Sequence, residues 1–285
     1  MRDESQVIQQ ILLFARNRED VRAVLMNGSR VNPNAPADPL QDYDVVFAAK
    51  DPWEFVRHPE WIRQFGELVM LQRNTLSERG AEWPIFLMQF TGGVRIDLQF
   101  IHLADAPLKA VSDSLTRVLL DKDGILPPLP PPGEQSYYTA PPGEEEFQNT
   151  VNSFWWCSAN VAKGLWRGEL SYVKMMFDVV VREDLLRLLR WYAGLLGGWK
   201  VNPGTAGKWL PRLLPAEIWD SYTRTFAGTA DNELWEALFE AGRLARRLGT
   251  GLSESLGMDY PLGDDERMNV FLRQIRDLPK SAGHF

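Results

Sequence analysis

Two aspartates of the chain are spaced as the ligands of a cation would be. Asp42 and Asp44 lie two residues apart at the start of a strongly apolar stretch, residues 43–49. Because side chains alternate across a strand, both carboxylates point to one face and Tyr43 points to the other. Two like charges that close together raise the pKa of one of them or require a cation between them. Mg²⁺ meets that need, since it prefers oxygen ligands and can share its coordination sphere with a triphosphate.

A third aspartate lies on a later apolar segment. Asp97 interrupts the stretch 94–101, where a charge is costly unless it serves a partner. Two uses are open for it. It belongs to the same site as Asp42 and Asp44, or it forms a structural ion pair with Arg95 or Arg30.

The tripeptide Gly28-Ser29-Arg30 follows the apolar stretch 21–26. A strand that ends in Gly-Ser lets the backbone approach a phosphate closely, because Gly28 has no side chain to clash and Ser29 offers an N–H and a hydroxyl. Arg30 adds a planar cation suited to phosphate oxygens. A lone Gly-Ser is most often a turn, but followed by three aspartates it predicts a phosphate site.

Composition bounds the class of protein. The 285 residues are 45% hydrophobic and 24% charged, with a formal net charge of −7, which is typical of a folded protein of about two domains. One cysteine excludes an internal disulfide, and with three histidines it leaves too few soft ligands for a zinc site. No stretch approaches the about 18 apolar residues of a membrane span. We therefore expect a cytoplasmic protein without a membrane partner.

The acidic balance also favours one kind of ligand. A negatively charged surface repels the phosphate backbone of nucleic acid and attracts a cationic small molecule. We therefore expect no nucleic-acid partner.

The elements that must position these residues form a mixed α/β domain. A helical period covers residues 5–18, and residues 52–63 read as a second helix with proline in its first turn. The short apolar stretches predict about five strands, at residues 21–26, 43–49, 68–72, 85–91 and 94–101.

A proline-rich segment, residues 127–143, separates this first domain, residues 1–126, from the rest, residues 144–285. Such a segment prefers extended geometry over helix or central strand. Beyond it the period is helical, which predicts a helical bundle with a glycine-rich break at 194–207. The predicted fold class is α+β: a mixed sheet of about five strands followed by a helical substrate-binding domain.

Four charged residues of the helical domain are candidates for substrate contacts. Asp178 lies on a nearly all-apolar helix and has basic residues four positions before and after it. It is either an acid that binds a guanidinium-bearing substrate or the centre of an ion-pair ladder. Glu145 either stabilises a helix N-terminus or faces a cleft. Lys163 and Lys208 are candidate triphosphate contacts, with solvated surface lysines as the alternative.

The order of Gly28-Ser29-Arg30, Asp42-x-Asp44 and Asp97 resembles the nucleotidyltransferase superfamily, which includes DNA polymerase beta. Within it, the chain is similar to the aminoglycoside 6-adenylyltransferases, which act on streptomycin. The likeness extends over residues 5–275 and is strongest in segments 24–33, 41–44, 154–156 and 161–167. The loop 35–40 and the proline content of 127–143 depart from the family's pattern.

The resemblance implies transfer of AMP from ATP to the 6-hydroxyl of streptomycin, with release of pyrophosphate, by a monomeric enzyme that requires Mg²⁺. Asp42 and Asp44 would hold the metal, and Asp97 would be a further ligand or the base. Ser29 and Arg30 would hold the departing phosphates. One alternative is another acceptor, such as a lincosamide or a protein hydroxyl. The other is an antitoxin-like nucleotide-binding module without turnover, against which the presence of all three aspartates argues.

Overall fold

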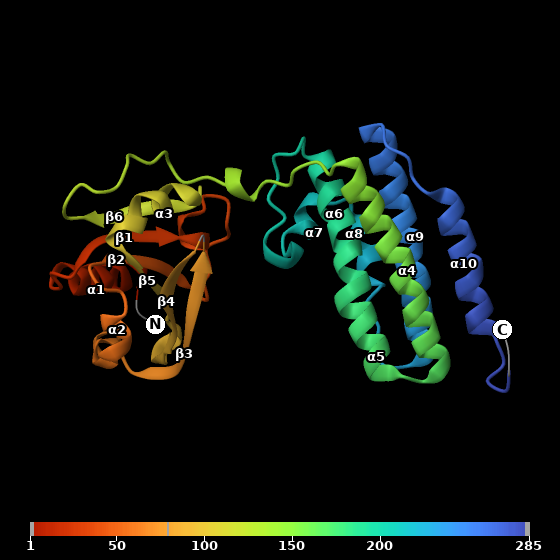
Figure 1. Cartoon of the computed structure of the whole chain (residues 1–285), viewed down its shortest axis with the longest axis horizontal. Helices are drawn as coiled ribbons and strands as arrows, with labels where there is room; N and C mark the ends of the chain where they lie inside the picture. Colours follow the sequence, from red (N-terminus) through yellow and green to blue (C-terminus); the bar gives the residue numbers. More distant parts are fainter. Residues whose placement is uncertain (1–2, 79, 283–285) are drawn as a thin grey trace. The chain divides into compact units, whose positions relative to one another are not determined.

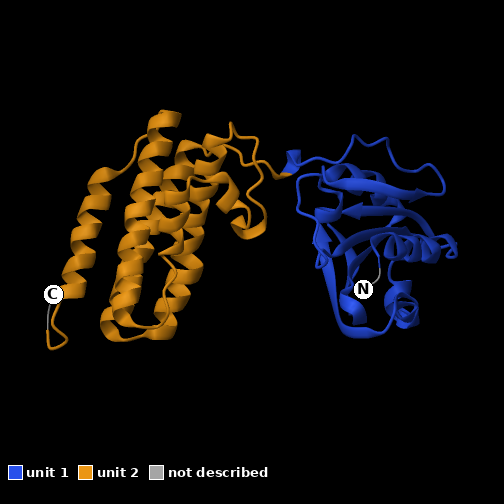
Figure 2. Ribbon diagram, turned by 180° about the vertical axis from the view of Figure 1, so that it is seen from behind, with its two compact units in different colours: residues 1–136 blue, residues 137–285 orange. Residues whose placement is uncertain are grey.

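The computed structural model describes residues 3–78 and 80–282. The chain divides into two compact units, Met1–Ser136 and Tyr137–Phe285 (Figure 1, Figure 2). The division falls within the proline-rich segment 127–143. Each unit buries a hydrophobic cluster of its own.

Unit 1 is built on a six-stranded sheet with the strand order β3-β4-β5-β2-β1-β6. β2 and β5 run parallel and the other neighbours are antiparallel, so the predicted mixed sheet is confirmed. It has one strand more than we expected, the edge strand β6. The strands are β1 (Val21–Asn27), β2 (Tyr43–Ala49), β3 (Leu68–Glu78), β4 (Ala81–Phe90), β5 (Arg95–His102) and β6 (Thr116–Asp121).

An aromatic cluster fills the space between one face of this sheet and its helices. Helices α1 (Glu4–Arg16) and α2 (Glu54–Arg57) contribute to it, as does the 3₁₀ segment Pro59–Phe65. The rings of Phe55 and Phe100 stack with centroids 3.9 Å apart. Buried aromatic side chains of this size make the largest contributions to a core, so this face holds β2 and β5 firmly in register.

The opposite face of the sheet is covered by α3 (Ala106–Ser112). Leu25, Val46 and Ile101 from β1, β2 and β5 pack there with the alanines of α3. Because side chains alternate along a strand, Asp44 projects to this same face as Val46.

The prediction of one continuous helix over residues 52–63 is wrong, because the α-helix is interrupted. α2 ends just before Pro59, where a 3₁₀ segment begins. Proline lacks the N–H that would continue the helix and disfavours helical geometry in the residue before it. His58 accordingly has φ −124° and ψ 76°.

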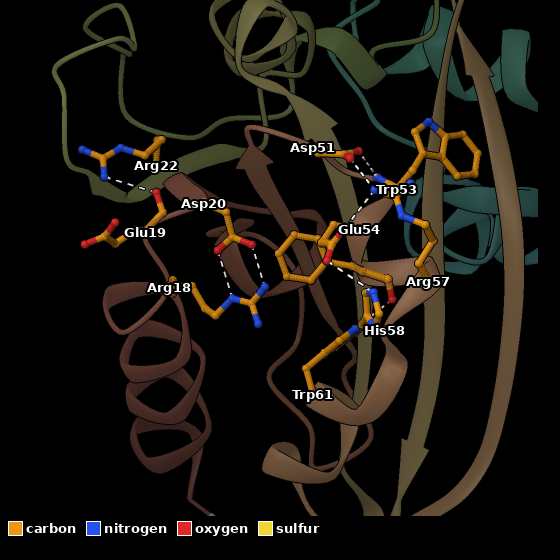
Figure 3. A network of polar contacts seen from close by, with 12 residues as sticks. Arg18, Glu19, Asp20, Arg22, Asp51, Trp53, Glu54, Arg57, His58 and Trp61 are labelled. Atoms are coloured by element: carbon orange, nitrogen blue, oxygen red, sulfur yellow. Dashed lines mark hydrogen bonds and ion pairs between the residues drawn. The ribbon is translucent and has the colours of Figure 1, made fainter.

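A network of ion pairs lies at the end of the sheet where β1 begins and β2 ends (Figure 3). Arg18 donates two hydrogen bonds to Asp20, at 2.9 and 2.6 Å, and Arg57 pairs with Asp51. Because β1 and β2 are antiparallel, this end is opposite to the one that carries the predicted site. Exposed pairs of this kind contribute about 0.2–1 kcal/mol each, so the network is a minor contribution to stability.

Unit 2 is helical over its described length, as predicted. Residues 170–196 form one helical rod in three parts, with a π turn at Met176–Val181 between two α-helical parts. No helix within residues 3–78 and 80–282 is long and apolar enough to cross a membrane. The α-helices are α4 (Glu144–Arg167), α5 (Leu170–Met175), α6 (Arg182–Leu196), α7 (Leu210–Leu213), α8 (Ala216–Thr223), α9 (Asp231–Leu256) and α10 (Leu262–Asp277).

A fully buried aspartate joins three parts of this bundle. Asp265 on α10 accepts hydrogen bonds from Arg246 on α9, at 2.7 and 2.6 Å. It also accepts from Tyr260 in the preceding loop at 2.7 Å and from Asn269 at 2.6 Å. A buried carboxylate is tolerated only when it is paired and hydrogen-bonded in this way.

We expect the substitution Asp265→Ala to destabilise unit 2 by about 3 kcal/mol or more, because it leaves the partners of a buried charge unsatisfied. Asp264→Ala is the matched control, since Asp264 is exposed and its pair with Arg267 lies on the surface; that change should cost less than about 1 kcal/mol. Urea denaturation followed by circular dichroism measures both. Equal denaturation midpoints for the two variants would show that the hydrogen bonds of Asp265 contribute nothing to the stability of unit 2.

Candidate active site

Gly28 stands at the point where β1 ends and a short 3₁₀ turn, Gly28–Val31, begins. Its φ is +75°, a conformation that side-chain-bearing residues rarely adopt. A Cβ atom added there would collide with the carboxylate of Asp44. The glycine is therefore needed both for the turn and for the close approach of that carboxylate to the backbone.

The strand register brings two of the predicted aspartates together. Asp44 on β2 is the register partner of Asp97 on β5, and on its other side it pairs with Asn27 on β1. Side chains paired in this way lie on the same face of the sheet. Asp42 directly precedes β2, and its carboxylate comes within 3.4 Å of the Arg95 guanidinium that also binds Asp97. The three carboxylates therefore form one cluster, which we call the aspartate cluster.

The electrostatics of the aspartate cluster are those of like charges in a partly buried place. Burial raises the pKa of Asp44 to about 6, and the negative charges of Asp97 and Asp42 add to the rise. Burial also raises the pKa of Asp42, although the nearby Arg95 opposes that change. A cation would relieve this repulsion, as the spacing in the sequence predicts.

Arg95 supplies a cation of the chain's own. Its Nε and Nη2 donate to the two carboxylate oxygens of Asp97 at 2.9 and 2.8 Å, and its Nε lies 3.4 Å from Asp42 Oδ2. The structural ion pair considered for Asp97 therefore exists, and it exists inside the cluster. The spacing Arg95-x-Asp97 was the signal in the sequence, because it places both side chains on one face of β5.

The chemistry of this donor set fits a hard divalent cation. The aspartate cluster offers carboxylate oxygens only, the ligand type that Mg²⁺ prefers. Within the described residues, however, no three Asp, Glu, His or Cys side chains are arranged to hold a metal ion, and Arg95 already contacts two of the three carboxylates. The predicted ligands fit the metal in chemical type, and the structure pairs two of them with an arginine.

Arg30 holds the chain that leads into β2. Its guanidinium lies 3.7 Å from the ring centre of Tyr43 and donates to the backbone carbonyls of Gln41 at 2.6 Å and Asp42 at 3.1 Å. A third bond, of 3.1 Å, reaches Glu4 on α1. With a side chain only 8% exposed, Arg30 acts here as a positioning residue for Asp42, and its contact with a phosphate stays a prediction.

Two polar residues beside Asp44 did not emerge from the sequence. Asn27 lies next to it on β1 and donates to the Thr116 hydroxyl at 2.7 Å. Within the described part of the chain its Oδ1 is buried and has no hydrogen-bond partner. Thr116 belongs to the unpredicted strand β6, so only the structure could reveal this pair.

The helical unit places Asp178 within a ladder of ion pairs. Its two carboxylate oxygens contact Lys174 at 2.6 Å and Arg182 at 2.8 Å, each one helical turn away. These two cations, and the hydrogen bonds that go with them, hold the pKa of Asp178 below its ordinary value against the opposing effect of burial. The ion-pair ladder considered for Asp178 is therefore present, and its role in substrate binding stays a prediction.

The other three candidates of the helical unit lie on its surface. Glu145 is exposed in the first turn of α4, where a negative charge stabilises the helix through its dipole. Lys163 is exposed near the other end of α4, and Lys208 is exposed with its Nζ 5.3 Å from the ring centre of Trp209. Their roles remain predictions.

Comparison with known proteins identifies the family of this chain. The sequence profile of the streptomycin adenylyltransferase family matches residues 1–275. The chain is 32% identical over 270 residues to an aminoglycoside 6-adenylyltransferase of Bacillus subtilis (strain 168), an alignment that covers 93% of this chain and 95% of the relative. It is 31% identical over 280 residues to the enzyme of the same name from Campylobacter jejuni, with 96% of each chain covered.

A solved structure points the same way. The crystal structure of an aminoglycoside 6-adenyltransferase from Bacillus subtilis superposes with a TM-score of 0.50 at 27% identity, and covers 98% of this chain and 100% of that one. The sequence and structure comparisons thus agree with each other. The chain belongs to the streptomycin adenylyltransferase family and is a nucleotidyltransferase.

Proposed function

We propose that the protein transfers AMP from ATP to a hydroxyl of an aminoglycoside, with the 6-hydroxyl of streptomycin as acceptor and pyrophosphate as product. The observation that carries this proposal is the register of Asp44 and Asp97 on neighbouring strands beside Gly28. The names of the family and of its relatives supply the acceptor class.

Asp42 and Asp44 are the residues that would hold Mg²⁺. When bound, the ion supplies positive charge to the triphosphate and so stabilises the charge that develops during transfer. The raised pKa of Asp44, about 6, still leaves its carboxylate ionised at neutral pH. The turn at Gly28 places the Asp44 carboxylate against the backbone, and Ser29 beside it would offer its N–H and hydroxyl to the departing phosphates.

Asp97 is the candidate base. The acceptor hydroxyl oxygen forms a bond to the α-phosphorus of ATP, and the bond from that phosphorus to the bridging oxygen breaks, so that pyrophosphate leaves. The hydroxyl proton then passes to the Asp97 carboxylate. Asp97 is 14% exposed, so part of its side chain is open to solvent. A role as a further metal ligand is the alternative for this residue.

Charge favours a cationic acceptor. The protein carries a net charge of −7, which attracts an aminoglycoside and raises its local concentration. With Asp178 engaged by two cations, we assign Glu145 to the acceptor. Lys163 and Lys208 are assigned to the triphosphate on charge alone.

We expect Asp42→Asn to lower AMP transfer to streptomycin by about 100-fold or more, because an amide is a poorer ligand for Mg²⁺ than a carboxylate. Asp38→Asn is the control, since Asp38 is exposed in the same loop and its hydrogen bond to the backbone of Leu40 survives in asparagine. Pyrophosphate release measures both. Full transfer by a folded Asp42→Asn protein would rule out the metal role.

The acceptor is tested with the same assay. A panel of streptomycin, other aminoglycosides, a lincosamide and a protein substrate should give the highest kcat/KM with streptomycin. Turnover with another class of acceptor and none with streptomycin would show that the acceptor is wrong and that the proposed transfer of AMP still holds. Nucleotide binding without turnover on any acceptor would favour the antitoxin-like module.

The raised pKa of Asp44 predicts a pH-dependent metal affinity. Above pH 6 its carboxylate is ionised and able to bind a cation; below pH 6 the bound proton competes. We expect the Kd for Mn²⁺, measured without nucleotide, to be about tenfold weaker at pH 5 than at pH 7.5. Asp44→Asn should bind Mn²⁺ weakly at both values. A wild-type affinity that does not change between them would contradict the assignment.

A further inference from the structure

Arg95 contacts two carboxylates of the aspartate cluster and has no part in the proposed reaction. It is the first residue of β5, and its side chain is 42% exposed. Its guanidinium contacts both carboxylate oxygens of Asp97 and approaches Asp42 Oδ2. An arginine in this place binds the same oxygens that a divalent cation would need.

The two cations therefore compete. An oxygen whose lone pairs point at a guanidinium N–H is a weaker metal ligand, and two cations side by side repel each other. The charge of Arg95 opposes the rise in the pKa of Asp44 and of Asp42, and its guanidinium binds the Asp97 carboxylate directly. It offsets part of their mutual repulsion.

Arg95 is also able to move. The exposed part of its long side chain lies in solvent, while Asp97 is 14% exposed and fixed within the sheet register. Rotation about the side-chain bonds of Arg95 needs no change in the backbone. The aspartates of β2 and β5 do not have that freedom, because their strands are packed on the aromatic cluster.

We propose that Arg95 is the counter-cation of the aspartate cluster while no divalent ion is bound, and that it gives up its contacts with Asp42 and Asp97 when one binds. The inference rests on the proposed metal role of the cluster. It makes Arg95 a positioning residue that keeps the site folded in the empty enzyme and sets the threshold for metal binding.

The test is metal binding by Arg95→Gln without nucleotide. We expect this variant to melt at a lower temperature than wild type in the presence of a chelator, since three carboxylates lose their counter-charge. We expect its Kd for Mn²⁺, measured by titration calorimetry or electron paramagnetic resonance, to be about tenfold tighter, because no ion pair has to open first. Mn²⁺ should therefore raise its melting temperature more than that of wild type.

Arg22→Gln is the matched control. Arg22 forms a two-pronged pair with Asp123, with Nε to Oδ2 at 2.6 Å, and lies on β1 of the same sheet. Its loss should leave Mn²⁺ affinity unchanged. If Arg95→Gln does not fold, Arg95→Lys keeps the charge and loses the paired hydrogen bonds, and its Kd should lie between wild type and the value expected for Arg95→Gln.

The outcomes separate the two claims. If wild type binds Mn²⁺ and the Arg95→Gln variant binds it with equal or lower affinity, the proposed role of Arg95 is wrong. The proposed metal site is then unaffected. Failure of both proteins to bind Mn²⁺ overturns the metal site, and the inference with it. Binding by Arg95→Gln alone would support both.

Discussion

The carboxylates of Asp44 and Asp97 are held on one face of two parallel neighbouring strands, and Asp42 lies beside them. Three negative charges so close together repel one another, and partial burial makes the repulsion stronger than it would be in water. Burial, and then the charges of Asp97 and Asp42, raise the pKa of Asp44. Much of the surrounding structure serves to hold these groups in place, and the Arg95 guanidinium offsets part of their charge.

The constraints around the aspartate cluster come from different parts of unit 1. The aromatic cluster keeps β2 and β5 in register from the opposite face of the sheet. Gly28 leaves room for the Asp44 carboxylate, and Arg30 binds the backbone of Asp42. The ion pairs of Figure 3 lie at the other end of the strands and, within the described residues, do not contact the aspartate cluster.

Much of the scaffold and the centre of the site could be predicted from local patterns. The apolar stretch 43–49 coincides with β2 over all of its residues. The place of Gly28 follows from the end of an apolar stretch, and the face on which Asp44 lies follows from the alternation of side chains along a strand. What could not be predicted depends on contacts between distant segments. The position of the Arg30 side chain depends on its contacts with Tyr43 and Glu4. The ion pairs of Asp178 depend on which face of its helix is exposed to solvent. β6 was missed because an edge strand with exposed positions lacks a clear alternation of apolar residues.

The central claim is that Asp42 and Asp44 hold a divalent cation beside the glycine-serine turn. Anomalous diffraction at the manganese edge tests it most directly, on crystals grown with Mn²⁺ and a non-hydrolysable ATP analogue. The account predicts a manganese peak within coordination distance of both carboxylates, with the triphosphate at Gly28 and Ser29. A nucleotide bound elsewhere, or manganese without contact to either aspartate, would contradict it.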